Sequence, residues 1–536
     1  MWQQNYTPIG DSLALSASVA AIPIAVLLLM LGVFRKPAWI AGLAGLGAAA
    51  VVALFGYGMP ATTVLGAATF GMAFGLLPIG WIVFSAILLY RLMVETGKFE
   101  IIKDSVGSLT PDRRLQALLI AFAFGAFIEG AAGFGSPVVV AAGMLIGLGF
   151  SPFYAAAICL LANTAPVAFG SIGIPVTTLA GTTGLPVKEL SAMVGRICAP
   201  ISFFVPSYLI LVMGGWKALR GVLPAALICG GTFAGLQFLV SNYVGAELVD
   251  ITSSLAAIAA LVILFKLWKP SDTFHLEGES TEAPVLRKHN WSELFWAWMP
   301  YLLLVIFVLI WGQEGVKATL NTFTKNIPWP GLHNMVERVP PTVGKPAPYA
   351  AIYAFNWLSA AGTACVFATI LAAALLRVSP RRFAGIVVQT FQQLAKPLLT
   401  IASVLGLAFL MNYCGATATL GLAFASTGST FPFFSALLGW LGVFLTGSDT
   451  SANALFGNLQ VVTANRLGLD PVLMASANSA GGVMGKMISL QSIAVAAAAT
   501  GMKAEEEAKL FRLTLRHSIF LASMIGLLTV YYAYGR

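Results

Sequence analysis

The sequence predicts an all-α polytopic membrane protein with about 12 crossings and two re-entrant hairpins, in which two halves form an inverted repeat of broken helices. Three observations support this fold class. Of the 536 residues, 58% are hydrophobic and only 10% are charged, and the mean hydropathy is +0.86. Lys and Arg gather in particular loops, and two interrupted stretches of the chain resemble each other. A water-soluble core cannot bury so much apolar surface, so the predicted solvent of this chain is a lipid bilayer.

Ten segments have the length and apolar character of ordinary membrane spans. The first is too long for the core of a signal peptide and has no basic region before it, so we predict a retained span. The ten spans are predicted at 12–34, 38–58, 61–93, 190–215, 222–242, 247–268, 293–312, 349–376, 384–412 and 512–534.

The loops between these spans predict the orientation of the chain. Cytoplasmic loops of membrane proteins carry an excess of Lys and Arg. Placing every basic loop in the cytoplasm puts both termini outside, and the segment 313–348, rich in Pro, Trp and Gly, then becomes a large external loop. The basic loops are 35–36, 216–220, 269–290, 377–382 and 503–512.

Two stretches, 115–183 and 432–500, differ from simple spans. Their apolar pieces are short and are interrupted by GAAGFGSP and NTAPVAFGSIGIP in the first stretch and by GSDTSAN and NSAGGVMGKM in the second. Each is predicted to form a re-entrant hairpin followed by a broken helix. The two stretches also share ordered positions, for which chance similarity in Ala- and Gly-rich sequence is the alternative. Phe127, Gly130, Pro152 and Asn163 correspond to Phe444, Gly447, Pro471 and Asn478.

The loops that flank these stretches have opposite charge patterns. The loop 94–114 before the first stretch is basic, whereas its counterpart 413–431 has no charge; after the stretches the order is reversed, with 184–190 sparse and 501–512 strongly charged. The two units are therefore predicted to face opposite ways across the membrane, which is typical of secondary transporters that bind substrate near the midplane. The predicted organisation is a first repeat at 1–215, linking spans and a cytoplasmic loop at 216–292, and a second repeat at 293–536.

Three long strings of residues resemble the bacterial L-lactate permease family. They are IEGAAGFGSP at 128–137, SPFYAAAICLLANTAPVAFGSIGIPVTTLA at 151–180 and LTGSDTSANALFGNLQ at 445–460, and the resemblance extends over essentially the whole chain. It implies a secondary active transporter that imports L-lactate and related 2-hydroxymonocarboxylates, D-lactate and glycolate, by proton symport across the bacterial inner membrane. The resemblance does not by itself assign a role to any residue.

A small hydroxy acid anion needs positive potential for its carboxylate and hydrogen-bonding groups for its hydroxyl. The N-termini of half-helices supply this potential without a full charge, and small residues let the backbone approach the ligand. The alternative is a packing role, in which small side chains and interhelical hydrogen bonds hold the helices together. The candidate substrate-binding residues are Gly133, Gly135, Ser136, Asn163 and Thr164 in the first unit and Thr450, Ser451, Asn453, Asn478 and Ser479 in the second.

Ionisable residues inside the two interrupted stretches are the sharpest functional candidates. Glu129 and Asp449 lie close to the predicted hairpin tips, where burial suits an acid that takes up and releases a proton. Both are candidates for proton coupling, with a salt bridge or a helix cap as the alternative. Lys486 is a candidate for binding the substrate carboxylate or for replacing a bound sodium ion, with snorkelling as the alternative. Arg196 and Arg516 are predicted interface anchors, with substrate steering as the alternative.

Other kinds of site find no support in the sequence. GGVMGKM at 481–487 does not complete a phosphate-binding loop, because the required first glycine would fall at Ala480 and Met487 stands where Ser or Thr is needed. Neither HExxH nor GxSxG occurs. Five single cysteines and four scattered histidines offer no metal constellation. We therefore predict a transporter and not an enzyme, with no cofactor, no metal and no nucleic acid; its predicted partners are a small monocarboxylate, protons and the lipid bilayer. A sodium-coupled carboxylate carrier is the first alternative, followed by an anion channel and an intramembrane enzyme.

Overall fold

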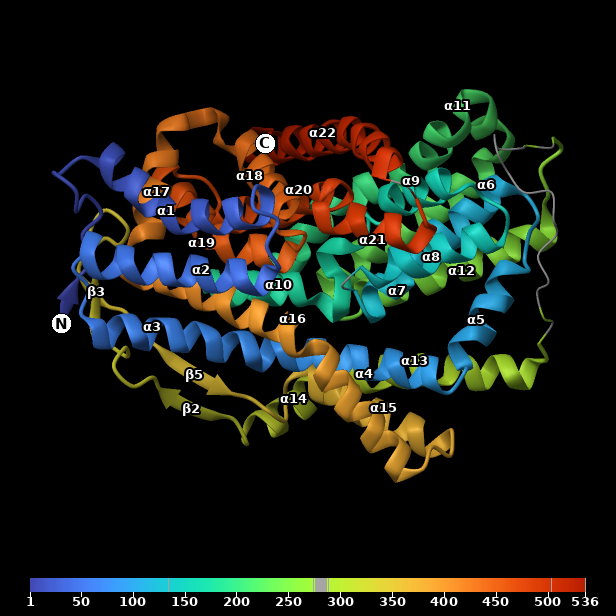
Figure 1. Cartoon of the computed structure of the whole chain (residues 1–536), viewed down its shortest axis with the longest axis horizontal. Coiled ribbons are helices and arrows are strands. Elements are labelled where there is room, and N and C mark those ends of the chain that lie inside the picture. Colours follow the sequence, from blue (N-terminus) through green and yellow to red (C-terminus); the bar gives the residue numbers. More distant parts are fainter. Residues whose placement is uncertain (134, 273, 275–286, 288, 503, 536) are drawn as a thin grey trace.

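The computed structural model describes the chain except for residues 134, 273, 275–286, 288, 503 and 536. Within the described part, ten helices are long and apolar enough to cross a membrane, and up to 12 spans result when each of two bent helix pairs is counted as one. The predicted all-α membrane fold with broken helices is thereby confirmed. Most of the long helices run along the long axis of the molecule (Figure 1).

The first part of the chain is helical apart from one short strand, with π-helical segments (η1 to η3) and a 3₁₀ turn (η4) between α-helices. Its elements are β1 (Trp2–Gln3), α1 (Leu13–Gly32), α2 (Ala38–Val51), η1 (Val52–Gly56), α3 (Ala61–Phe74), η2 (Gly75–Gly80), α4 (Trp81–Glu95), α5 (Lys98–Gly107), α6 (Arg113–Gln116), η3 (Ala117–Phe124), α7 (Gly125–Ala131), α8 (Ser136–Gly147), α9 (Pro152–Ala162), η4 (Val167–Phe169), α10 (Gly170–Thr183), α11 (Val187–Tyr243) and α12 (Val249–Leu267).

The second part contains four further short strands and two 3₁₀ segments (η5 and η6). Its elements are α13 (Trp291–Gly312), α14 (Glu314–Asn321), β2 (Lys325–Pro328), β3 (Val336–Arg338), β4 (Ala347–Pro348), β5 (Ile352–Phe355), α15 (Ala361–Leu375), α16 (Pro380–Cys414), α17 (Ala416–Phe424), η5 (Ala425–Thr430), α18 (Phe431–Thr446), α19 (Asp449–Leu467), α20 (Pro471–Gly485), η6 (Lys486–Ile488), α21 (Leu490–Thr500) and α22 (Ala504–Tyr534).

Both chain termini lie in the half of the molecule that also contains the strands, which we call the termini end. Strand β1 pairs in parallel with β3, and β3 pairs antiparallel with β4. The hydroxyl of Thr419 donates a hydrogen bond to the carbonyl oxygen of Tyr6 (3.0 Å), and the hydroxyl of Tyr534 donates one to the carbonyl oxygen of Ser429 (3.2 Å). Because α17 and η5 are continuous, these contacts place both termini in the half of the molecule where Figure 1 also shows the strands, with the C-terminus nearer the middle of the long axis.

Basic loops gather at the opposite end of the molecule. The Arg382 guanidinium donates to the carbonyl oxygen of Glu95 (2.5 Å). The guanidinium of Arg114 is fully buried and pairs with Asp272 (2.8 Å). The first contact joins the start of α16 to the end of α4, before α5. The second joins α6, after α5, to the segment that follows α12. The distribution is the one that an excess of Lys and Arg in the cytoplasm would produce.

Each interrupted stretch forms a helical hairpin followed by a broken helix pair. The first unit has the hairpin α7–α8 and then α9 and α10, whose axes bend by 63° across the break. The second has the hairpin α18–α19 and then α20 with η6 followed by α21, which bend by 41°. The same order of elements therefore occurs twice, while the inverted orientation of the two halves stays a prediction.

Three predicted segments differ from the structure. The span predicted at 349–376 begins only with α15 at Ala361, because residues Ile352–Phe355 form β5 and pair antiparallel with β2. Tyr353 of this strand packs its ring edge-on against Phe70, so its apolar character serves the sheet and not the bilayer. The loop predicted at 413–431 is instead mostly helical, and the long α11 contains two predicted spans that are separated by non-helical residues at Gly214 and Gly215.

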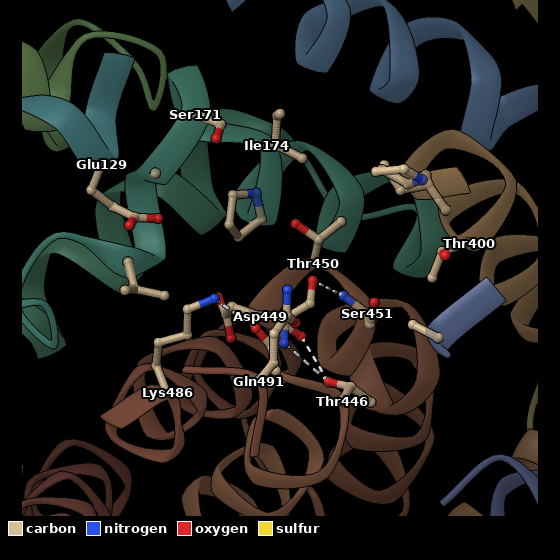
Figure 2. A pocket seen from close by; sticks show the side chains of 18 of the residues that line it. Glu129, Ser171, Ile174, Thr400, Thr446, Asp449, Thr450, Ser451, Lys486 and Gln491 are labelled. Atoms are coloured by element: carbon tan, nitrogen blue, oxygen red, sulfur yellow. Dashed lines mark hydrogen bonds between the residues drawn. The ribbon is translucent and has the colours of Figure 1, made fainter. Parts of the chain in front are cut away.

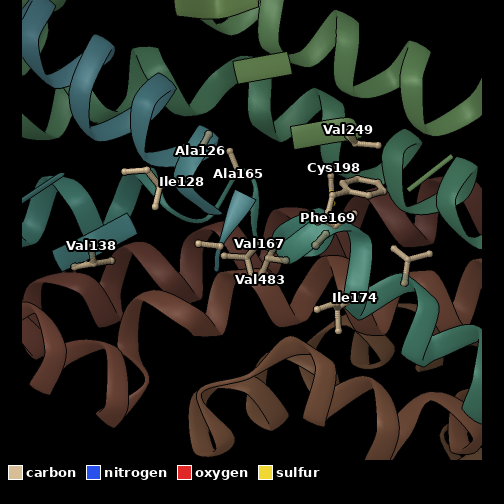
Figure 3. Close-up of a cluster of buried hydrophobic side chains, with 14 of the residues drawn as sticks. Ala126, Ile128, Val138, Ala165, Val167, Phe169, Ile174, Cys198, Val249 and Val483 are labelled. Atoms are coloured by element: carbon tan, nitrogen blue, oxygen red, sulfur yellow. The ribbon is translucent and has the colours of Figure 1, made fainter. Parts of the chain in front are cut away.

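Apolar side chains from both units fill the space around the first helix break. Figure 3 shows Val167 and Phe169 from the break together with Val249 at the start of α12, Cys198 from α11 and Val483 from α20. All five side chains are buried. The break is thus held by packing against three other elements, α11, α12 and α20.

Candidate functional site

A cavity of about 330 Å³ lies where the tip of the α18–α19 hairpin meets the break at α10 (Figure 2). Pockets for small ligands have volumes of this order. The exposed Lys396 of α16 stands at its rim, and Ala38 and Trp39 of α2 also line it. The remaining lining residues that matter for its chemistry are Glu129, Gly170, Ser171, Ile174, Thr446, Ser448, Asp449, Thr450, Ser451, Lys486 and Gln491.

The tip of the α18–α19 hairpin presents a helix N-terminus to the cavity. Gly447 ends α18 in the left-handed conformation (φ +72°), which glycine adopts without steric cost. Ser448 then caps α19, and its hydroxyl accepts a hydrogen bond from the backbone N–H of Ser451 (3.2 Å). Thr450 and Ser451 follow in the first turn and line the cavity (Figure 2). Such a helix start attracts a carboxylate.

Asp449 is held by side chains of α19 and α20. The Ser479 hydroxyl donates to Oδ2 of Asp449 (2.6 Å), and Nδ2 of Asn453 donates to the same oxygen (3.3 Å). The network continues from Asn453 to Asn478 (3.0 Å) and from Asn478 to Gln460 (3.1 Å). Asp449 therefore does not act as the helix cap that was its alternative role, since that position belongs to Ser448.

Lys486 directs its ammonium group to the hairpin tip. The side chain is only 9% exposed, and its Nζ donates to the carbonyl oxygen of Gly447 (2.6 Å). Glu129 and Asp449 are its electrostatic neighbours, and all three line the cavity (Figure 2). Within the described chain, no ion pair joins Lys486 to either acid. Because the ammonium is buried beside a cavity, snorkelling does not describe its position.

The break at the start of α10 is strained and holds the first hairpin in place. Ser171, Ile172 and Gly173 all have left-handed backbone conformations (φ +47°, +61° and +73°). For the two residues that are not glycine, this conformation costs on the order of 1–3 kcal/mol each. The Ser171 hydroxyl donates to the carbonyl oxygen of Ala132 at the end of α7 (2.9 Å), so the break and the hairpin are tied together.

Glu129 lies between the break and the cavity with few polar contacts. A Cβ atom on Gly170 would lie 2.6 Å from Oε1 of Glu129, so only glycine leaves room for this carboxyl group. Its Oε2 atom has no hydrogen-bond partner among the described residues. The nearby Asn163 is 3% exposed, and neither polar atom of its side chain makes a hydrogen bond with a described residue.

The structure brings some of the predicted site residues to the cavity and places others behind it. Glu129, Asp449, Thr450, Ser451 and Lys486 line the cavity. Asn453, Asn478 and Ser479 form the network behind Asp449, and the hydroxyl of Thr164, in the turn after α9, donates to the carbonyl oxygen of Leu161. Gly133 lies against Ser171, and Gly135 and Ser136 start α8 beside α21 without lining the cavity. Arg196 and Arg516 are exposed and do not line it.

Several lining residues escaped the sequence analysis. Ser171 and Ile174 belong to the string GSIGIP, whose Gly and Pro residues were a usable signal of the break. Gln491 follows the second break and carried no such signal. Thr400 and Lys396 come from α16, whose approach depends on tertiary packing alone.

A second cavity, of about 560 Å³, lies nearer the termini end. Arg338 lines it and stacks its guanidinium over the ring of Tyr349 at 4.5 Å. Asn412 also lines it, and its Nδ2 donates to the carbonyl oxygen of Thr182 (3.3 Å), another lining residue. The Thr182 hydroxyl in turn donates to the carbonyl oxygen of Asn453 (3.4 Å). Polar contacts between α10, α16 and α19 thus link the wall of the second cavity to the network behind Asp449.

A multi-pass helical protein with broken helices around a buried polar cavity belongs to the class of membrane transporters. Comparison with known proteins gives the family. The family model described as L-lactate permease matches residues 16–534, and the chain therefore belongs to the L-lactate permease family. The family and its curated relatives are named as permeases and not as enzymes.

Curated relatives match the chain over nearly its whole length. The L-lactate permease of Bacillus subtilis (strain 168) is 47% identical, and the match covers 98% of each chain. The glycolate permease GlcA of Escherichia coli (strain K12) is 45% identical over 99% of this chain and 98% of its own. The L-lactate permease of Salmonella typhimurium is 43% identical over 100% of this chain and 98% of its own.

Proposed function

We propose that the chain imports L-lactate and related 2-hydroxymonocarboxylates, D-lactate and glycolate, by proton symport across the bacterial inner membrane. The observation that carries this proposal is the buried Lys486 in a cavity that also contains two acids, Glu129 and Asp449, and the N-terminus of α19. The names of the relatives, which include L-lactate permeases and a glycolate permease, support the choice of substrate.

The substrate carboxylate is proposed to bind between Lys486 and the first turn of α19. The ammonium group and the free N–H groups of the helix start are the positive groups of the cavity. Hydroxyl groups of Thr450, Ser451 and Ser171 also line it and can accept from or donate to the 2-hydroxyl group. Gly133, Gly135, Ser136, Asn163, Thr164, Asn453, Asn478 and Ser479 are proposed to shape this site from behind.

Proton coupling is proposed to follow from the charges around the cavity. When Glu129 and Asp449 are ionised, they repel a carboxylate and compete for Lys486; when they are protonated, the ammonium is free to attract the substrate. Substrate anion and proton therefore bind more favourably together than separately. No bound sodium ion is needed in this scheme, because the tethered ammonium of Lys486 supplies the positive charge.

Alternating access is proposed to use the two cavities. The first opens past Lys396, and the second lies toward the termini end, with contacts of Asn412 and Thr182 between them. In this proposal residues 1–215 and 293–536 are the inverted repeats, residues 216–292 link them, and both termini are periplasmic. Rocking of one unit against the other would break one barrier while it forms the other.

Uptake by reconstituted protein tests the proposal. Labelled L-lactate is offered to proteoliposomes under a pH gradient and, separately, under a sodium gradient, with D-lactate and glycolate as competitors. We expect accumulation under the pH gradient alone and competition by both compounds. Accumulation under the sodium gradient alone would instead identify a sodium-coupled carrier. Absence of counterflow would identify a channel, because only a carrier exchanges label across a closed barrier.

A further inference from the structure

Asp250, in the first turn of α12, is a buried acid that the proposed transport scheme does not use. Its side chain is 1% exposed, and neither Oδ1 nor Oδ2 has a hydrogen-bond partner among the described residues. It belongs to the linking spans, outside both interrupted stretches, and so it was not among the predicted site residues. Buried polar groups without partners are rare in native proteins and call for an explanation.

Helix electrostatics alone do not explain this residue. An ionised carboxylate in a membrane interior costs about 3 kcal/mol or more. A position in the first turn of a helix recovers only about 0.3–1 kcal/mol. Asp250 also accepts no hydrogen bond from the N–H groups of its own helix, as a capping side chain would. The balance favours a carboxyl group that holds a proton in this environment.

Asp250 lies directly against the hairpin that carries Glu129. A Cβ atom on Gly130 would come within 2.7 Å of Cβ of Asp250, so α7 and α12 are in close contact next to Glu129. Glu129 is an electrostatic neighbour of Asp250, and the Cys198 thiol of α11 is the other titratable group that faces it. The adjacent elements η3 and α10 contain no titratable residue.

The surroundings of Asp250 extend from Glu129 to a cavity at the surface. Figure 3 places Val249, which precedes it, beside Cys198 and the first helix break. The loop before α12 contacts the same break, since a Cβ atom on Gly173 would lie 2.8 Å from the carbonyl group of Ala246. Glu247 in this loop lines a surface cavity of about 410 Å³ together with Lys188 and Gln313. Carboxyl groups thus occur at the surface, at Asp250 and at the substrate cavity.

We propose that Asp250 relays protons between the surface cavity beside Glu247 and Glu129. The O–H bond of the Asp250 carboxylic acid breaks as a new O–H bond forms on the Glu129 carboxylate, directly or through one water molecule. The Asp250 carboxylate then takes a proton from water in the cavity beside Glu247, and the order is reversed for release. This inference rests on the proposed proton symport, and it assigns to one acid of the linking spans the path by which the proton reaches the site.

The test compares Asp250→Asn with wild type in proteoliposomes. The amide has the shape of the acid but transfers no proton. We expect exchange of labelled L-lactate for unlabelled L-lactate to stay within about twofold of wild type, since no net proton movement is required, while accumulation under a pH gradient falls by at least about tenfold. Asp250→Glu should recover part of the accumulation. Glu189→Gln, which removes an exposed acid from the first turn of α11, is the matched control and should behave as wild type.

The outcomes separate this inference from the proposed function. If wild type itself fails to accumulate lactate under a pH gradient, proton symport is wrong and the relay falls with it. If wild type accumulates and Asp250→Asn does so equally, the relay alone is wrong. Loss of exchange together with accumulation would show a structural role and also overturns the relay.

Infrared spectroscopy covers the case in which Asp250→Asn does not fold. We expect wild type to show a protonated carboxyl band that responds to lactate and that persists in Glu129→Gln but changes in Asp250→Glu. A band that disappears completely in Glu129→Gln would leave Asp250 without a proton to transfer and would overturn the relay.

Discussion

Replacing Lys486 by Met is the most direct test of the proposed carboxylate site. Methionine is about as long as lysine and remains apolar, so the packing of the stem is largely preserved. The change removes the hydrogen bond from Nζ to the carbonyl oxygen of Gly447 (2.6 Å). It also removes the buried cation of the cavity lining, which leaves the exposed Lys396 as the other basic side chain among the lining residues.

The expected loss of affinity follows from one charge-assisted hydrogen bond. Such a bond contributes about 1.5–3 kcal/mol to binding when the group is buried. At about 1.4 kcal/mol for each tenfold change, the dissociation constant for L-lactate should rise roughly 10- to 150-fold. The upper part of this range applies if Glu129 and Asp449, deprived of their counter-charge, also repel the substrate.

Calorimetric titration of L-lactate into the purified protein measures this change. Lys98→Met in α5, far from the cavity lining, is the matched control and should bind as wild type. The thermal transition of each variant establishes that it is folded. A dissociation constant of folded Lys486→Met within about threefold of wild type would refute the proposed role, because no buried counter-charge is that weak.

Three further changes test coupling, orientation and the loops. Glu129→Gln keeps the shape of the neutral acid, so lactate exchange should survive while accumulation under a pH gradient is lost; equal accumulation would make Glu129 structural. After replacement of the native cysteines, Val187→Cys should react with an external impermeant thiol reagent in intact cells and Ala508→Cys should not, and labelling of both would contradict opposite sides. The Nε2–H group of His289 donates a hydrogen bond to Oδ2 of Asp104 (2.9 Å), and this hydrogen bond raises the pKa of His289 above the usual 6.5. Its stabilisation should be complete below about pH 6.5 and disappear as the pH rises through the raised pKa. The melting-temperature difference between wild type and His289→Gln should therefore shrink with rising pH, and a constant difference would refute the pairing.

The site was only partly predictable, and the residues show why. Glu129, Asp449 and Lys486 stood out because a charge inside an apolar stretch is expensive wherever the helix lies. Thr450 and Ser451 followed from the same tip, since a hairpin turn brings sequence neighbours together. Their contribution to the cavity wall needed no knowledge of other segments.

Other residues became visible only through contacts between distant segments. Gln491 and Thr400 face the cavity because α21 and α16 pack there, and nothing in their own surroundings in the sequence marks them. In the sequence, Asp250 is indistinguishable from any acid in the first turn of a helix; only the packing of α7 and α11 against it reveals its surroundings. The predicted span at 349–376 failed for the same reason, since pairing of β5 with β2 at the termini end competes with helix formation.

The sequence by itself determined the membrane solvent, the number of spans, the two interrupted stretches and the family. These depend on hydrophobicity, on backbone breaks at glycine and proline and on residue strings, all of which are local properties of the chain. Tertiary structure alone decided which side chains face the cavity and which stand behind it. It also decided that Asp250 is buried without a hydrogen-bond partner among the described residues, because the surroundings of a side chain are made by helices that are distant in sequence.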